Sequence, residues 1–231
     1  MMAFVPLNSH PNPQNVLVIG GGDGGVVREV AKHPAVKSIV MCEIDEEVVN
    51  ACKEHIPSLA CGFDDPRLTL HIGDGLEFLC SYPGQFDVII TDSTDPVVGD
   101  SDHQKSKDGP AMSLFNEEYY TKLHEKLTPE GILCSQGESM WLHKELIGSL
   151  LAKSRTVYPV VDYAYTCTPS YPSGQIGLIM CSKNPKTIFR EPVLSWTADE
   201  LKQYGLKYYN TDIHSAAFTL PTFMQEFLNT L

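Results

Sequence analysis

The sequence is poor in basic residues and has no long apolar run. Lys and Arg number 17 against 29 Asp and Glu, which gives a formal net charge of -12. This balance provides little attraction to nucleic-acid phosphates or anionic lipid and suits a cationic small molecule better. No apolar run reaches the roughly 18 residues of a membrane-spanning helix, and Met1 to Leu7 lacks the basic and apolar regions of a secretory signal. We therefore expect a cytoplasmic protein with neither nucleic acid nor a membrane as partner.

Paired cysteines are also lacking. The seven cysteines are odd in number and include no CxxC pair, so we expect free thiols rather than a disulfide framework or a cysteine zinc site. His143 and His214 have no second ligand at metal spacing, which favours surface or packing roles. The sequence predicts no metal site.

Short apolar runs alternate with helix-patterned stretches over the first two thirds of the chain. Strands are expected at 16–19, 38–43, 67–71, 86–91, 131–135, 157–166 and 175–181, and helices at 26–33, 46–55, 75–80, 116–127, 141–154, 197–204 and 221–228. Repeated strand–helix units predict an α/β fold with a mostly parallel sheet, helices on both faces and ligands at the carboxyl ends of the strands. The last two strands, joined by a short link, are expected to pair antiparallel. We interpret residues 1–231 as a single domain.

A glycine-rich turn follows the first predicted strand. Gly20-Gly21-Gly22-Asp23-Gly24-Gly25 fits the GxGxxG pattern of nucleoside sites, although a sharp turn that needs positive φ would explain it equally. Glu43 ends the second strand about twenty residues later, where an acidic side chain accepts the ribose hydroxyls. Asp23 would repel the pyrophosphate of NAD and suits a ligand with a positively charged tail.

Further carboxylates follow the third and fourth predicted strands. Asp74, in Gly73-Asp74-Gly75, could accept a hydrogen bond from an adenine amine or cap a helix. Asp92 and Asp95 stand in the turn that ends at Pro96, and only Asp95 has the alternative of a plain turn residue. Together with Asp23 and Glu43 they place five carboxylates at one edge of the sheet. Their repulsion favours a site for a positively charged ligand.

The motifs VLVIGGGDGGVVREV, CEID, GDG, DVIITDSTDP, YPSGQIG and LKYYN, in this order, resemble the spermidine synthases, which are polyamine aminopropyltransferases. The resemblance implies a Rossmann-like fold of the class I methyltransferase kind. It also implies transfer of the aminopropyl group of decarboxylated S-adenosylmethionine, a co-substrate rather than a cofactor, to putrescine. The products would be spermidine and methylthioadenosine, and the enzyme would be a homodimer.

The resemblance also implies roles for individual residues. Asp92 resembles the catalytic base, Asp23 the residue that holds the aminopropyl amine, and Glu43 the ribose ligand. The nucleoside substrate would contact Gly20, Gly22, Asp23, Glu43, Asp74, Gly75 and Asp92, and the diamine would contact Asp92, Ser93, Thr94, Asp95 and Tyr171. Without the resemblance, Tyr171 would be interpreted as a loop aromatic packed on Pro169 or Pro172.

Two features depart from the family pattern. Family members carry an N-terminal β-rich segment before the stretch that begins at Pro6, so we expect weaker dimerisation if that segment is truly absent. The link Val97 to Ala111 is longer than usual and could enlarge a lid or loop outward. Separately, Gln136-Gly137-Glu138 could bring another carboxylate to the diamine or cap the following helix.

The chemistry of the reaction fits the acidic residues. A primary alkylammonium has a pKa of about 10.4, so deprotonation at pH 7 costs about 4.6 kcal/mol and a carboxylate such as Asp92 can accept the proton. Alternatives are a related transferase (spermine synthase or putrescine N-methyltransferase) and a catalytically silent nucleoside-binding form. An NAD-dependent dehydrogenase is disfavoured by Asp23.

Overall fold

A seven-stranded sheet forms the centre of the computed structural model, which describes residues 1–93 and 117–231. Its strand order is β3-β2-β1-β4-β5-β7-β6. The strands are β1 (Asn15–Gly20), β2 (Ser38–Glu43), β3 (Leu68–Ile72), β4 (Phe86–Asp92), β5 (Leu127–Gln136), β6 (Val160–Cys167) and β7 (Gln175–Ser182). The first five are parallel, whereas β7 pairs antiparallel with both β5 and β6.

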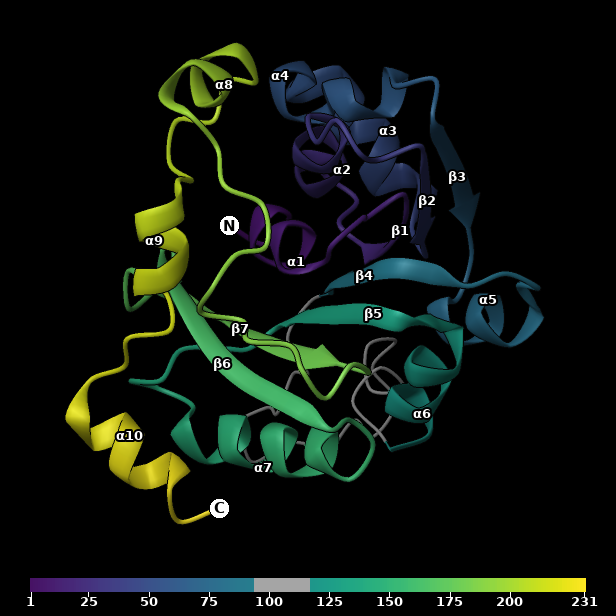
Figure 1. Ribbon diagram of the computed structural model, residues 1–231. Coiled ribbons are helices and arrows are strands. Elements are labelled where there is room, and N and C mark those ends of the chain that lie inside the picture. Colours follow the sequence, from purple (N-terminus) through teal and green to yellow (C-terminus); the bar gives the residue numbers. More distant parts are fainter. Residues whose placement is uncertain (94–116) are drawn as a thin grey trace.

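Helices cover both faces of this sheet (Figure 1). They are α1 (Phe4–Ser9), α2 (Gly25–Ala31), α3 (Glu46–His55), α4 (Pro57–Ala60), the 3-10 turn η1 (Cys61–Asp64), α5 (Gly75–Ser81), α6 (Glu117–Lys126), α7 (Lys144–Arg155), α8 (Ala198–Gln203), α9 (Thr211–Ala216) and α10 (Thr222–Leu228). One apolar core packs α5, α6, α7 and α10 on one face, and a second packs α1, α2 and the C-terminal segment on the other. Within residues 1–93 and 117–231, no helix has both the length and the apolar character needed to cross a bilayer.

The predicted fold class is confirmed, because alternating strand and helix signals arise from strands buried on both faces. Val16, Leu17 and Val18 of β1 are each fully buried, and successive side chains of the strand enter opposite cores. Strand order reverses between β1 and β4, where Gly20 pairs with Asp92. This switch point is where parallel α/β sheets bind ligands.

Several predicted boundaries are wrong. The fifth strand extends from Leu127 to Gln136 rather than from 131 to 135, since its pairing with β4 passes through a register shift between Phe86 and Val88. The helix expected at 141–154 begins only at Lys144. The short helices α1, α4 and α9 and the 3-10 turn η1 were not predicted.

A side-chain hydrogen bond joins the C-terminal segment, residues 186–231, to α1, and buried hydrogen bonds hold the segment together internally. Asn8 Oδ1 accepts from Trp196 Nε1 at 2.9 Å. His214 is fully buried: its Nε2 lies 2.8 Å from Phe189 O and its Nδ1 lies 2.8 Å from the Tyr209 hydroxyl. Because the carbonyl can only accept, Nε2 carries the proton and Nδ1 accepts from Tyr209. His214 therefore has the packing role that its sequence context favours.

Acid sensitivity is expected from a second buried histidine, His33. Its side chain packs against Phe4 and Trp196, and burial lowers its pKa to about 4. Between that value and about 6.5 the unfolded chain binds a proton that the folded chain does not, so stability falls as the pH falls. Between pH 7.5 and 4.5 this contribution amounts to about 2 to 3 kcal/mol.

His33→Phe removes this titration. Among the described residues His33 Nε2 has no hydrogen-bond partner to lose, and the bond that Nδ1 accepts from Ala35 N at 3.3 Å is lost at both pH values. Urea unfolding at pH 7.5 and 4.5 is expected to show a loss of stability about 2 to 3 kcal/mol smaller in His33→Phe than in the wild type. His55→Phe, at the exposed end of α3, is the matched control and should lose as much as the wild type. Equal losses in His33→Phe and His55→Phe would contradict the assignment.

Candidate functional site

The glycine-rich turn brings the end of β1 against the end of β4. Gly20, Gly21 and Gly24 have φ values of 79°, 74° and 78°, in the left-handed region that favours glycine. Gly21 N donates to Asp92 O at 2.8 Å, and a Cβ on Gly20 would lie only 2.2 Å from the same oxygen. The turn therefore has the backbone that the sharp-turn interpretation requires, and it holds Asp92 at the switch point.

Asp23 belongs to this turn, and the Glu43 side chain lies against it. Glu43 is 8% exposed, its Oε1 accepts from Asp45 N at 3.0 Å, and its Oε2 lies 3.1 Å from where a Cβ of Gly22 would be. Asp23 Oδ1 accepts from Gly25 N at 2.8 Å. Backbone N–H groups therefore fix both carboxylates beside the glycines.

Asp92 is the carboxylate most strongly influenced by its surroundings. Burial is the main cause that raises its pKa to about 6, and the nearby charges of Asp23 and Glu43 contribute to the same rise. No lysine or arginine of the described part of the chain forms an ion pair with any of these three residues. The three carboxylates share one site, and their mutual repulsion is relieved by a cation.

Asp74 has the helix-capping role that its sequence context allowed. Its Oδ1 accepts from Leu76 N and Glu77 N, both at 2.9 Å, at the start of α5, whose first residue is the buried Gly75. Burial raises the pKa of the neighbouring Cys42 thiol to about 12, with smaller contributions from Asp74 and Glu43. Asp74 thus stands at the same sheet edge as Glu43, with one oxygen occupied by the helix.

Tyr171 joins this edge through a residue whose role the sequence did not reveal. Gln136 ends β5, and its Nε2 donates to Asp92 Oδ1 at 3.2 Å and to the Tyr171 hydroxyl at 3.3 Å. Tyr171 therefore reaches the site rather than serving only as a packed loop aromatic. Ser93 follows β4 directly, whereas Thr94, Asp95 and the segment Val97 to Ala111 lie outside the described residues.

Glu138, the carboxylate of Gln136-Gly137-Glu138, pairs with a histidine at the start of α7. It is 7% exposed, and its Oε2 lies 2.9 Å from His143 Nδ1 at the start of α7. Its φ of 57° is in the left-handed region, and its carbonyl accepts from Gly177 N and the Tyr163 hydroxyl. His143 thus has an acidic partner that its sequence context did not indicate.

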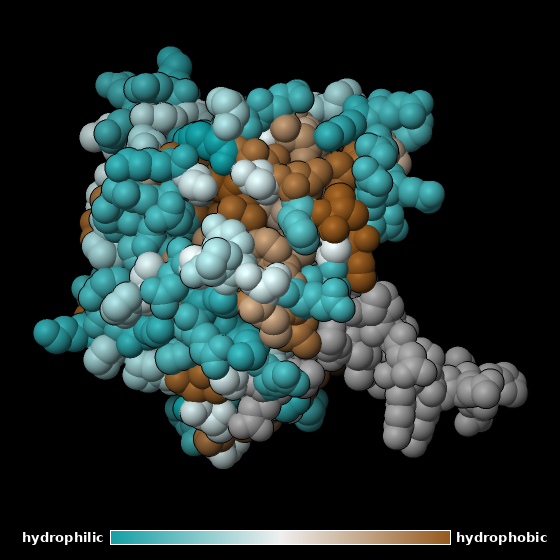
Figure 2. Space-filling model, turned by 90° about the vertical axis from the view of Figure 1, so that its right-hand side faces the viewer, coloured by the Kyte–Doolittle hydropathy of each residue, from teal (hydrophilic) through white to brown (hydrophobic). Residues whose placement is uncertain are grey.

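Exposed apolar side chains flank Glu43. Figure 2, which views the side that carries β3 and α5, shows an apolar area within hydrophilic surroundings. Ile44, Val48 and Ile72 are 52%, 42% and 38% exposed, and Val48 contacts the position of a Gly22 Cβ. An apolar wall beside a carboxylate offers a surface that suits the flat base of a nucleoside. The sequence feature that could have predicted this apolar wall is Ile44, an apolar residue directly after Glu43.

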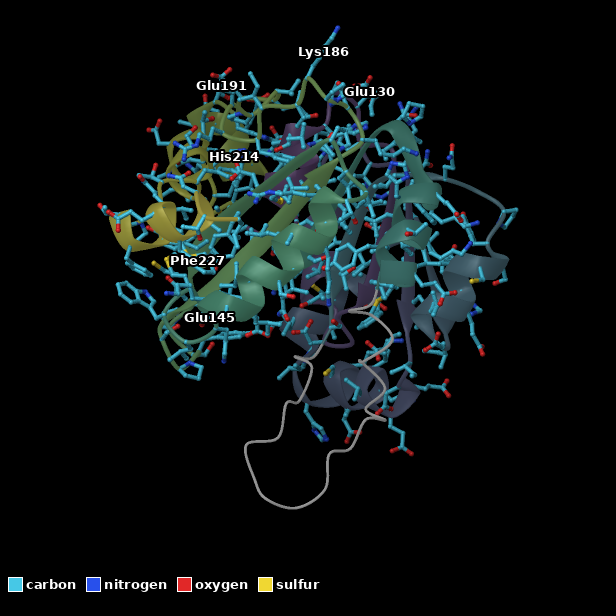
Figure 3. The ribbon with its side chains drawn as sticks, turned by 90° about the horizontal axis from the view of Figure 1, so that it is seen from below. Glu130, Glu145, Lys186, Glu191, His214 and Phe227 are labelled. Atoms are coloured by element: carbon cyan, nitrogen blue, oxygen red, sulfur yellow. The ribbon has the colours of Figure 1, made fainter. Side chains whose placement is uncertain are left out.

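A separate surface hollow of about 420 Å³ lies at the amino ends of the parallel strands. Its lining includes Glu130, Lys186 and Glu191, which stand along one edge of the molecule in Figure 3. The carboxylates at the glycine-rich turn lie at the other edge of the sheet.

The arrangement can therefore bind a nucleoside whose tail is positively charged and accept a proton from an amine beside it. The glycine-rich turn and the apolar wall offer a surface on which a nucleoside could lie, and Asp92 offers a partly buried carboxylate that could accept the proton. In the described part of the chain, no three His, Cys, Asp or Glu side chains are arranged to hold a metal ion.

The chain as a whole matches a family of known proteins. Residues 1–191 match the model of the spermine/spermidine synthase domain. A spermidine synthase of Dictyostelium discoideum is 48% identical over 229 residues, which cover 99% of this chain and 75% of that protein. A spermine synthase of Arabidopsis thaliana is 44% identical, over 97% of this chain and 61% of its own length. A crystal structure of spermidine synthase in complex with the transition-state analogue AdoDATO superposes with a TM-score of 0.85 at 33% identity, over 100% of this chain and 74% of that one.

Proposed function

The chain belongs to the spermine/spermidine synthase family, and we propose that it transfers the aminopropyl group of decarboxylated S-adenosylmethionine to putrescine. It is an aminopropyltransferase of the spermidine synthase type. The products are spermidine and methylthioadenosine.

One observation carries the choice of substrates: three carboxylates share a partly buried edge without a basic partner among the described residues. Decarboxylated S-adenosylmethionine has lost its own carboxylate, so its tail carries only positive charge, and putrescine is a dication. Asp23, Glu43 and Asp92 would repel an anionic ligand and attract these two.

We assign the proton transfer to Asp92. With its pKa at about 6, the carboxylate is ionised at pH 7 yet basic enough to accept a proton as the amine nitrogen attacks. The nitrogen forms a bond to the carbon next to the sulfonium, and the carbon–sulfur bond breaks with its electron pair moving to sulfur. We expect no metal or further cofactor, because the sulfonium is already an activated leaving group.

Product analysis tests the proposal. The chain is incubated with putrescine and either decarboxylated S-adenosylmethionine or S-adenosylmethionine, and the products are identified by mass spectrometry. Spermidine with methylthioadenosine supports it; a methylated putrescine would indicate the N-methyltransferase alternative. Spermine formed from added spermidine, without spermidine formed from putrescine, would indicate a spermine synthase. Methylthioadenosine binding without any product would indicate the silent form.

Glu43→Gln is expected to weaken methylthioadenosine binding about tenfold, since a neutral amide accepts ribose hydrogen bonds less strongly than a carboxylate. It should also lower the pKa of Asp92, because one of the charges that raises that pKa is gone. Titration calorimetry measures the binding, and Glu47→Gln on the exposed first turn of α3 is the matched control. Unchanged affinity in Glu43→Gln would remove Glu43 from the nucleoside site.

A homodimer and a cytoplasmic location are further expectations from the family resemblance. Light scattering of the purified chain tests the dimer.

A further inference from the structure

We propose that Gln136 is a positioning residue, which holds Asp92 and Tyr171 in one arrangement and sets the pH range over which Asp92 accepts the proton. The inference rests on the proposed function, since it concerns the base of that reaction. It assigns Gln136 no direct part in the chemistry.

The geometry accounts for both hydrogens of the Gln136 amide. One points to Asp92 Oδ1 at 3.2 Å and the other to the Tyr171 hydroxyl at 3.3 Å. An ionised carboxylate can only accept hydrogen bonds, so the amide nitrogen rather than its oxygen must face Asp92. The side chain of Gln136 therefore connects the end of β4 to the β6–β7 connection.

The main chain at Gln136 is held firmly. Gln136 pairs with Leu178 on β7, Gly137 N donates to Gly177 O at 2.8 Å, and Gly177 N donates to Glu138 O at 2.6 Å. Glu138 has a positive φ, a conformation that is unfavourable for a non-glycine residue and is kept only where surrounding contacts hold the backbone in place. The backbone from which the Gln136 side chain extends is therefore held in place at the end of β5.

The connection that carries Tyr171 is fixed as well. Thr168 N donates to Gly174 O at 2.8 Å, and Gly174 N donates to Tyr171 O at 2.9 Å. The Ser139 and Ser173 hydroxyls lie 2.7 Å apart and join this turn to the segment after β5. Since both ends of the Gln136 bridge are ordered, the bridge can orient side chains at little entropic cost.

The charges around Asp92 determine the direction of the effect. Asp23, in the turn after β1, and Glu43, at the end of β2, disfavour its ionised form, as does burial. The Cys134 thiol on β5 also interacts electrostatically with Asp92, and the Tyr171 hydroxyl accepts from the same Gln136 amide. Gln136 opposes these effects, because a hydrogen bond donated to a carboxylate favours its ionised form.

Replacing the amide with an apolar side chain of similar length tests the proposal. In Gln136→Met the acid limb of kcat/KM for putrescine is expected to move upward by about one pH unit. The deficit relative to the wild type should then be about fivefold larger at pH 6 than at pH 8. The affinity for methylthioadenosine should stay unchanged, because the amide has no part in that site.

A direct titration separates this proposal from the proposed function. The carboxyl carbon of Asp92 is followed by ¹³C NMR in aspartate-labelled protein and is identified by its absence in Asp92→Asn. An upward move of about one pH unit in Gln136→Met supports the inference. A wild-type protein without turnover would defeat the proposed function, yet the titration would still decide the role of Gln136.

The matched control is Gln14→Met. Gln14 precedes β1, and its Nε2 donates to Asn12 Oδ1 at 3.2 Å, some 20 Å along the strand from the site. If Gln136→Met fails to fold, Gln136→Asn replaces it, because an amide one methylene shorter cannot reach both acceptors. An acid limb and a carboxyl titration that both stay at their wild-type pH would overturn the inference.

Discussion

Asp92→Asn is expected to lower the rate of aminopropyl transfer at pH 7 by about 10³-fold while leaving nucleoside binding nearly unchanged. The amide has the shape of the carboxylate but cannot accept the proton that the attacking ammonium must lose. That deprotonation costs about 4.6 kcal/mol at pH 7, which corresponds to a rate factor of this size. The backbone oxygen of Asp92, which accepts from Gly21 N, is untouched by the substitution.

Single-turnover kinetics with saturating putrescine measure the loss, and titration calorimetry with methylthioadenosine measures the binding. Asp87→Asn is the matched control: it lies on the same strand, and its Oδ2 accepts from Gln14 N and Asn15 N, both at 2.9 Å, at the far end. An asparagine oxygen can accept the same bonds, so transfer should remain near the wild-type rate. A loss below tenfold in Asp92→Asn would remove Asp92 as the base.

The wild-type pH profile should agree with this role. Because kcat/KM reports the free enzyme, its acid limb should fall as the pH drops through about 6, where the pKa of Asp92 lies. Below that pH the carboxyl group is protonated and can neither attract the diamine nor accept its proton. In Asp92→Asn the residual rate should lose this limb.

The sequence predicted the sheet well because its parallel strands are buried on both faces. Val88, Ile89 and Ile90 form a continuous apolar run, and each is fully buried. The predicted end of the fifth strand was too early, since Gln136 belongs to β5 only through its pairing with Leu178 on β7. Pairing between distant segments leaves no local signal, so strand ends are the least certain part of such a prediction.

In the site, too, local sequence signals could be predicted and contacts between distant segments could not. Glu43 and Asp92 could be predicted to meet because carboxyl ends of parallel strands share an edge. The Gln136 bridge could not, because it depends on where the antiparallel β7 brings the turn that carries Tyr171. Asp74 shows the limit of residue type alone, since a carboxylate at a strand end can equally cap the next helix.

Gly20→Ala is expected to destabilise the fold by about 3 to 5 kcal/mol and to abolish methylthioadenosine binding. Two effects combine: alanine is strained at a φ of 79°, and its Cβ would lie 2.2 Å from Asp92 O, a backbone atom that cannot move without shifting β4. Gly205→Ala isolates the first effect, because Gly205 has a φ of 64° and no atom of the described residues lies within 4 Å of its Cβ position. That control should cost about 1 to 2 kcal/mol and leave binding intact. Urea unfolding and calorimetry compare the two, and equal losses in both variants would show that the close approach of β1 to β4 is not what the glycine provides.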